Sequence, residues 1–216
     1  MKPQVISKKR VTDHGEVLTG LREINAMLGL VQAETERIDS RFLEPACGNG
    51  NFLAEILQRK LSVVEKRYCK SQLEYERNAV LAVSSLYGID ILEDNVHQCR
   101  QRLVEIFEAR YTTLFKGSTN PRCLYAVRVI LGRNIIWGDA LTLRTVGAKP
   151  RHIVFSEWSP VNGSLLKRRD FTFQGLLAHE DTRELPLFSD LGDDVFIPEP
   201  QKEYAPVNFL DLADAE

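Results

Sequence analysis

The sequence lacks a C-x-x-C pair, a long apolar run and an apolar stretch behind its basic N-terminus. Its four cysteines are scattered over 216 residues, which argues against a disulfide framework and against a zinc site. We therefore expect reduced thiols, no metal and a cytoplasmic location. No segment has the roughly 20 apolar residues that span a bilayer, and MKPQVISKKRVTDHG has no secretory h-region. We therefore also expect no contact with a membrane.

The net charge of −2 conceals an uneven distribution. Residues 180–216 contain 11 acidic and 2 basic residues, whereas residues 1–179 contain 26 Lys and Arg against 19 Asp and Glu. A basic body beside an acidic tail is a weak sign of a polyanionic partner, because charge runs are commonly just solvated surface. Prolines among the acids of the tail predict an extended arm. The expected organisation is thus one domain over 1–179 and an acidic arm over 180–216.

Apolar spacing along the body alternates between helical and strand patterns. Helices are expected at Gly20 to Arg37, Asn51 to Lys60, Ser71 to Ser85, from Asp94 onward, and from Pro121 to Gly132. Strands are expected at Arg41 to Leu43, Leu86 to Asp90, Asn134 to Trp137 and His152 to Phe155. Strands separated by helices predict an α/β fold with a doubly wound parallel sheet.

The stretch FLEPACGNGNFL, Phe42 to Leu53, begins in an expected strand, continues through a loop of small residues and ends in an expected helix. Ligands of open α/β sheets bind at such turns, where glycines let the backbone approach closely. A P-loop would need Gly-Lys-Ser/Thr, and a dinucleotide fingerprint would need a third glycine and an acid about 20 residues later. Neither is present, which disfavours a triphosphate and a nucleotide-dependent oxidoreductase. A tight strand–helix turn without a ligand has the same pattern.

S-adenosylmethionine, which carries a sulfonium and an amino group but no phosphate, fits the acids in this region. Glu44 precedes the small-residue loop, and Asp90 and Asp139 end the next two strands. Glu44 is positioned for the amino group, Asp90 for the ribose hydroxyls and Asp139 for the adenine amine. Each acid alone is more commonly a cap or a solvated residue. Their order, each at a strand end, favours the methyl donor.

At these residues the chain resembles the N6-adenine DNA methyltransferases of restriction–modification systems. FLEPACGNGNFL resembles their motif I, YGIDI motif II and NIIWGDAL motif III, while RVTDHGEVLTG resembles the preceding motif X, with Gly20 where proline is common. The resemblance implies a class I, Rossmann-like methyltransferase fold in a restriction–modification or phage-defence setting. The cofactor-binding residues that it implies are Thr19, Glu44, Pro45, Ala46, Gly48, Gly50, Asp90, Ile91, Asp139 and Ala140.

The resemblance weakens at motif IV, Asn/Asp-Pro-Pro-Tyr/Phe, which orients the target amine in that family. After the expected fourth strand the sequence continues Ser156-Glu157-Trp158-Ser159-Pro160. Glu157 could accept a hydrogen bond from an amine, and Trp158 could stack on a flipped base. Packing of Trp158 in the core and Glu157 at the surface fits equally well. The candidate catalytic residues are Ser156, Glu157 and Trp158.

The cluster Lys167, Arg168 and Arg169 would suit contacts to DNA phosphates, although a solvated turn is an equal reading. No target-recognition domain follows, so the family resemblance implies a partner chain that supplies specificity. Two hypotheses result. The first is an S-adenosylmethionine-dependent DNA adenine methyltransferase, divergent or split. The second is a non-catalytic relative that keeps the cofactor pocket and uses the acidic arm to dock a partner or cover the basic body.

Overall fold

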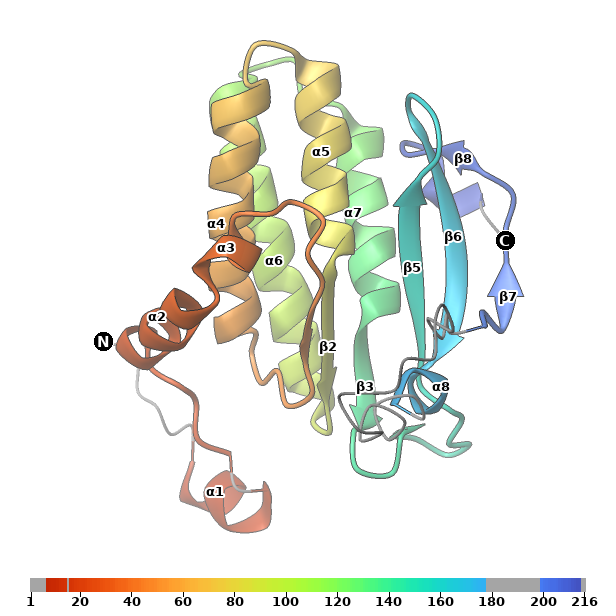
Figure 1. The fold of residues 1–216 in the computed structure, drawn as a ribbon. Coiled ribbons are helices and arrows are strands. Elements are labelled where there is room, and N and C mark those ends of the chain that lie inside the picture. Colours follow the sequence, from red (N-terminus) through yellow and green to blue (C-terminus); the bar gives the residue numbers. More distant parts are fainter. Residues whose placement is uncertain (1–6, 15, 178–198, 215–216) are drawn as a thin grey trace, which may run out of the picture.

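The computed structural model describes residues 7–14, 16–177 and 199–214, which form an α/β fold (Figure 1). The helices are α1 (Lys8–His14), α2 (Leu21–Leu30), α3 (Gln32–Thr35), α4 (Asn51–Tyr68), α5 (Gln72–Ser84), α6 (Glu93–Leu114), α7 (Pro121–Asn134), α8 (Phe173–Leu177) and the 3-10 turn η2 (Leu212–Asp214). The strands are β1 (Phe42–Glu44), β2 (Leu86–Asp90), β3 (Ile135–Asp139), β4 (Arg144–Thr145), β5 (Val154–Pro160), β6 (Leu165–Thr172), β7 (Lys202–Glu203) and β8 (Val207–Asn208).

The first sheet has the order β1-β2-β3-β4, with β1, β2 and β3 parallel and β4 antiparallel to β3. Helix α5 ends at Ser84 and α7 at Asn134, so each runs almost directly into the strand that follows it. The sheet is therefore mixed, and its expected parallel part is confirmed for three strands. Because these three strands are parallel, their carboxyl ends lie at one edge of the sheet.

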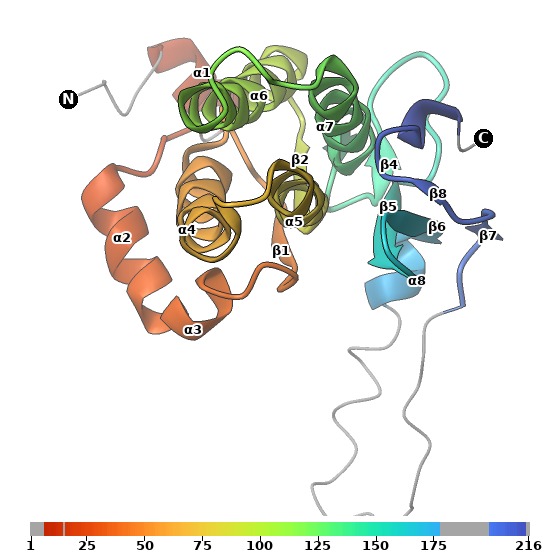
Figure 2. The same ribbon diagram turned by 90° about the horizontal axis from the view of Figure 1, so that it is seen from above.

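The long helices α4, α5, α6 and α7 lie side by side as a bundle, as the view along their axes shows (Figure 2). Apolar residues at helical spacing explain this packing, because they form one stripe on each helix. On α4 the stripe includes Leu53, Leu57, Leu61 and Val64, each with no exposed surface. The bundle and the adjoining face of the sheet share one continuous apolar core.

Lys60 is the polar exception in the buried stripe of α4. Its side chain has no exposed surface, and its ammonium donates to the backbone carbonyls of Arg37 at 2.9 Å, Ile38 at 3.0 Å and Ser40 at 2.5 Å. Burial lowers the pKa of Lys60 to about 7. These three bonds fix the segment that leads into β1 against α4.

The expected fourth strand differs from the observed one in length, direction and partner. Instead of a parallel strand over His152 to Phe155, β5 runs through Pro160 and pairs antiparallel with β6. The turn between them contains Gly163 at φ +54°, a conformation that favours glycine. The apolar residues of the expected strand predicted its burial. The strand continues through Pro160 and pairs with β6, so the two strands form a hairpin.

This hairpin changes how the first sheet is covered. Tyr87 and Ile89 project from β2 toward Ile153, Phe155 and Phe173, which form a second apolar cluster. The bundle helices therefore pack against one face, while the β5–β6 hairpin and the short helix α8 cover the other. The α/β class is confirmed, and the mixed sheet with its helices is compatible with a Rossmann-like fold. In the described residues, the second face is covered by the hairpin and the short helix α8 instead of by further long helices.

The described end of the chain packs onto the body. Strands β7 and β8 both pair antiparallel with β6, and Phe209 and Leu212 have no exposed surface within the main core. Residues 199–214 of the expected extended arm are thus part of the folded body, because their apolar side chains fill the space between the hairpin and α7. The remainder of the arm, 180–198 and 215–216, lies outside the described residues.

Two expectations from composition can be compared with the fold. All four cysteines lie in described segments and have free thiols. Across the described ranges, no helix is both long and apolar enough to cross a membrane.

Burial of the C-terminal segment predicts a stability effect. Phe209→Ala should lower the free energy of unfolding by about 3–5 kcal/mol, because it removes a fully buried aromatic ring. Tyr125→Ala, which truncates a ring that is 55% exposed, should change it far less and serves as the control. Urea unfolding followed by circular dichroism measures both, and equal midpoints would contradict the packing of this segment.

Candidate functional site

A cavity of about 690 Å³ lies at the carboxyl ends of β1, β2 and β3. The segment before α2, the loop from β1 to α4, and the residues after β2 and β3 form its walls. All of the predicted cofactor-binding residues except Gly50 line it: Thr19, Glu44, Pro45, Ala46, Gly48, Asp90, Ile91, Asp139 and Ala140. The fold thus brings residues from four distant segments into one cavity.

The lining of this cavity is strongly acidic. Within the described residues it includes no Lys, Arg or His, and its carboxylates belong to Asp13, Glu16, Glu44, Asp90 and Asp139. We call it the acidic cavity. A cleft lined by charges of one sign attracts ligands of the opposite sign. The acidic cavity therefore favours cationic groups and disfavours phosphates.

The loop between β1 and α4 is held by backbone contacts that require glycine. Gly48 and Gly50 have φ values of +51° and +83°, which favour glycine. The Cys47 amide donates to the Ile89 carbonyl at 2.8 Å, which ties the loop to β2. A Cβ atom at Gly50 would lie 2.6 Å from Cys99 Sγ on α6. Gly50 therefore allows the loop to pack on α6, although it does not line the acidic cavity.

Asp90 joins three segments through one buried carboxylate. Its Oδ2 accepts from the Gly48 amide at 2.8 Å, and its Oδ1 accepts from the Leu92 amide at 2.9 Å and from Asn95 Nδ2 at 3.2 Å. A carboxylate has about four acceptor sites. Described residues use three of these sites, so Asp90 has room for one further donor rather than for two ribose hydroxyls.

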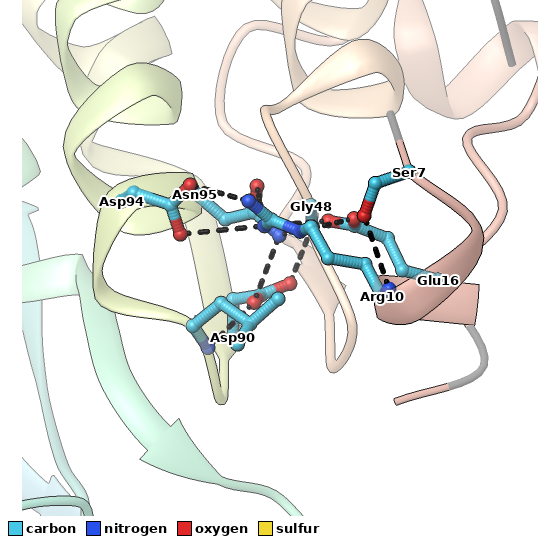
Figure 3. A network of polar contacts seen from close by, with 8 residues as sticks. Ser7, Arg10, Glu16, Gly48, Asp90, Asp94 and Asn95 are labelled. Carbon is cyan, nitrogen blue, oxygen red and sulfur yellow. Dashed lines mark hydrogen bonds and ion pairs between the residues drawn. The ribbon is translucent and has the colours of Figure 1, made fainter. Parts of the chain in front are cut away.

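A polar network connects the N-terminal segment to Asp90 (Figure 3). Arg10 contacts Glu16 through Nε at 2.5 Å and Asp94 through Nη1 at 2.6 Å. Asn95 Nδ2 donates to Glu16 Oε1 at 2.7 Å as well as to Asp90. Hydrogen bonding by Arg10 lowers the pKa of Asp94. These hydrogen bonds and ion pairs therefore hold the segment that resembles motif X against the start of α6, beside the loop between β1 and α4.

Glu44 and Asp139 have different electrostatic surroundings. Burial raises the pKa of Glu44, which has no ion-pair partner in the described part of the chain. The Leu141 amide donates to Asp139 Oδ1 at 2.9 Å and lowers the pKa of Asp139. Glu44 thus lacks a cationic partner among the described side chains, whereas the hydrogen bond from Leu141 stabilises the ionised form of Asp139.

Apolar side chains stand exposed at the same mouth. Leu141 is 94% exposed and Ile91 is 47% exposed, and both line the acidic cavity. They follow β3 and β2, so they flank the position of Asp139. An exposed apolar pair beside a hydrogen-bond acceptor suits a flat heteroaromatic ring with an amino group.

Sequence reasoning missed three residues of this site. Glu16 and Asn95 line the acidic cavity, and Arg10 holds both of them. Glu16 stands in the stretch RVTDHGEVLTG, where only Thr19 had been assigned a role. Asn95 lies in the first turn of α6, which begins at Glu93. In the resembled family, the segment that corresponds to RVTDHGEVLTG precedes motif I. This resemblance could have indicated that Arg10 and Glu16 lie at the site.

Two of the three predicted catalytic residues face the core instead of a cavity. Ser156 Oγ donates to Asp170 Oδ1 at 2.7 Å and is 3% exposed. Trp158 is 4% exposed and belongs to the main core. Ser156 to Pro160, which follow the expected fourth strand, belong to strand β5, in which alternate side chains point inward. Of the two readings of Trp158, core packing is the one observed.

Glu157, the third predicted catalytic residue, projects from the opposite face of β5. It forms ion pairs with Arg41 and, at 3.0 Å, with Arg169. It lines a separate cavity of about 460 Å³, and none of the described residues lines both this cavity and the acidic cavity. The structure therefore does not bring the predicted catalytic residues and the predicted cofactor residues into one cavity.

The predicted DNA-contacting cluster lies in β6 and is engaged within the protein. Lys167 pairs with Glu203 at 2.6 Å, and Arg168, only 4% exposed, pairs with Asp170 at 2.6 Å. Arg169 pairs with Glu157. The expected solvent-exposed turn is a strand, so the side chains point to alternate faces and Arg168 is buried.

Comparisons of the chain with protein-family models, curated proteins and solved structures find no match. In the described segments, no group of three or more His, Cys, Asp and Glu side chains is arranged to hold a metal ion. The assignment of a function therefore depends on the geometry of the cavities.

The contact between Gly50 and Cys99 predicts a specific stability effect. Gly50→Ala should destabilise the fold by about 2–4 kcal/mol, because it adds both backbone strain and a clash. Gly117→Ala, at φ +77° with open space around it, should cost only the strain. Thermal unfolding compares the two, and Gly50→Ala combined with Cys99→Ala should recover part of the loss. No recovery would contradict the clash.

Proposed function

We propose that the chain binds S-adenosylmethionine in the acidic cavity. The observation that carries the proposal is the described lining, which combines several carboxylates with no Lys, Arg or His. NAD and ATP carry phosphates that need donors or positive charge. S-adenosylmethionine has a cationic ammonium and a cationic sulfonium that suit an acidic lining. When bound, it supplies a methyl group activated by the positive sulfur.

The lining residues match the parts of this cofactor. Glu44, which has no ion-pair partner among the described residues, would hold the ammonium group, with Thr19 beside the methionine end as the family resemblance implies. Ile91 and Leu141 would enclose the adenine ring and Asp139 would accept from its amine. Asp90 would take one ribose hydroxyl, and Glu16, which accepts from the same Asn95 Nδ2, would take the other.

The proposed activity is that of the resembled family, methyl transfer to adenine in DNA, with a partner chain that recognises the target. A second candidate, a cofactor-binding relative without catalysis, is favoured by one observation. Ser156 and Trp158 are buried in the core, away from both cavities. In that case the chain serves as a subunit or regulator within a restriction–modification or phage-defence system.

Cofactor binding can be tested through Glu44. Isothermal titration should detect binding of S-adenosylmethionine but not of ATP, and Glu44→Gln should weaken binding at least tenfold. Glu23→Gln, which alters an exposed carboxylate on α2, should have no effect. A folded chain that gives no heat with S-adenosylmethionine would refute the proposal.

The same carboxylate predicts a pH dependence. Burial raises the pKa of Glu44 in the free protein, so the carboxylate becomes protonated early as the pH falls. An ammonium ligand binds only the ionised form, and affinity should therefore decline as the pH falls through this raised pKa. Titrations across pH should show this decline in the wild type and lose it in Glu44→Gln. An unchanged profile in the variant would place the ammonium elsewhere.

The two candidate functions differ in their product. Expression in a host free of DNA methylation, followed by genome-wide detection of modified bases, should reveal N6-methyladenine if the chain is catalytic. The assay should be run with and without the neighbouring genes, because a partner chain is proposed. Modified adenine that disappears in Glu44→Gln supports the enzyme, and unmodified DNA in both settings supports the non-catalytic candidate.

A further inference from the structure

The second cavity, of about 460 Å³, lies between the β5–β6 hairpin and β1 and β2. Its residues are Arg41, Leu43, Tyr87, Phe155, Glu157, Arg169, Phe171 and Leu176. We call it the aromatic cavity. The hairpin register explains its composition, since Phe155 is paired with Phe171 and Glu157 with Arg169. Alternate residues of the hairpin thus line the cavity, while those between them face the core.

Three aromatic rings supply the apolar wall. Tyr87 and Phe155 pack edge to face with centroids 5.3 Å apart, and Phe171 lies on the neighbouring strand. Leu43 and Leu176 extend the apolar surface. The size and the lining fit a small flat ring, because ligand cavities of this kind are mostly apolar with a few placed polar groups.

The polar groups of the aromatic cavity have an excess of donors. Glu157 accepts from Arg41, from Arg169 and, at 3.2 Å, from Ser159 Oγ, so three of its acceptor sites are used. Arg169 Nε is buried without a hydrogen-bond partner among the described residues. The available polar contact is therefore with guanidinium N–H groups and calls for an acceptor.

The charged side chains around the aromatic cavity also favour an anionic ligand. Among the described residues, Arg41 and Arg169 form ion pairs with one carboxylate, that of Glu157. Glu203 is paired with Arg169 in the sheet register, but its carboxylate binds Lys167 at 2.6 Å. The described lining of the aromatic cavity therefore carries one positive charge in excess. Arg41 is 63% exposed at its side chain, which places it at the mouth, while the rings lie deeper.

We propose that the aromatic cavity is a second binding site, for a small aromatic anion. The ring lies against Tyr87, Phe155 and Phe171, and a carboxylate or phosphate on the ligand binds Arg41 and Arg169. Guanidinium groups bind both kinds of oxyanion through paired N–H donors. The site is separate from the acidic cavity, because in the described part of the chain the two cavities share no lining residue.

The test uses four ligands that share one ring: 2-naphthoate, 2-naphthyl phosphate, 2-naphthol and 2-naphthylmethylamine. Titration calorimetry and ligand-observed NMR on the full chain should detect the carboxylate or the phosphate, with the alcohol and the amine at least tenfold weaker. Whichever anion binds more tightly identifies the natural oxyanion. Binding of neither anion at millimolar concentration, or equal binding of the amine, would overturn the proposal.

Two variants locate the site. Arg41→Gln should weaken anion binding at least tenfold, whereas Arg67→Gln, on an exposed part of α4, should leave it unchanged. Leu43→Trp should fill the cavity and abolish binding, with thermal unfolding to verify the fold. Anion affinity within twofold of the wild type in both cavity variants would overturn the assignment. Displacement of the anion by S-adenosylmethionine would show a single shared site and would also overturn it.

Discussion

The carboxylate of Asp90 is the contact on which the acidic cavity depends. It accepts from the loop at Gly48, from the backbone at Leu92 and from Asn95 on α6, so three chain segments meet at two oxygen atoms. Asp90 is only 8% exposed, and loss of a buried acceptor leaves each donor unsatisfied. The shape of the cavity, and not only one ligand contact, therefore rests on this side chain.

The parallel strands of the first sheet and the loop at Gly48 could be predicted because both follow from local pattern. Small residues after an apolar strand specify a turn, and an acid after each following strand lies at the same sheet edge. The hairpin could not be predicted in the same way. Residues 153–155 form a short apolar run that suits a parallel or an antiparallel strand equally, and only distant partners decide between them.

The charged stretch of β6 shows a second limit of sequence reasoning. Lys167, Arg168 and Arg169 read as a solvated or DNA-binding turn, but strand alternation turns Arg168 inward. There it forms an ion pair with Asp170, two residues along the same face, and its guanidinium lies 4.1 Å from the ring centroid of Tyr204. A buried charge is tolerated only with such partners, and Tyr204 lies too far along the chain for local pattern to reveal it.

The alternation of β1 separates the two proposed binding sites. Leu43 projects into the aromatic cavity, while the next residue, Glu44, projects into the acidic cavity. Neighbouring residues of a strand point to opposite faces, so a ligand in one cavity is divided from the other by the strand itself. A methyl group on a donor in the acidic cavity would therefore not reach a ring in the aromatic cavity without movement of β1 or the hairpin. This separation weighs against Glu157 as a catalytic residue in the described conformation, and in favour of two independent sites.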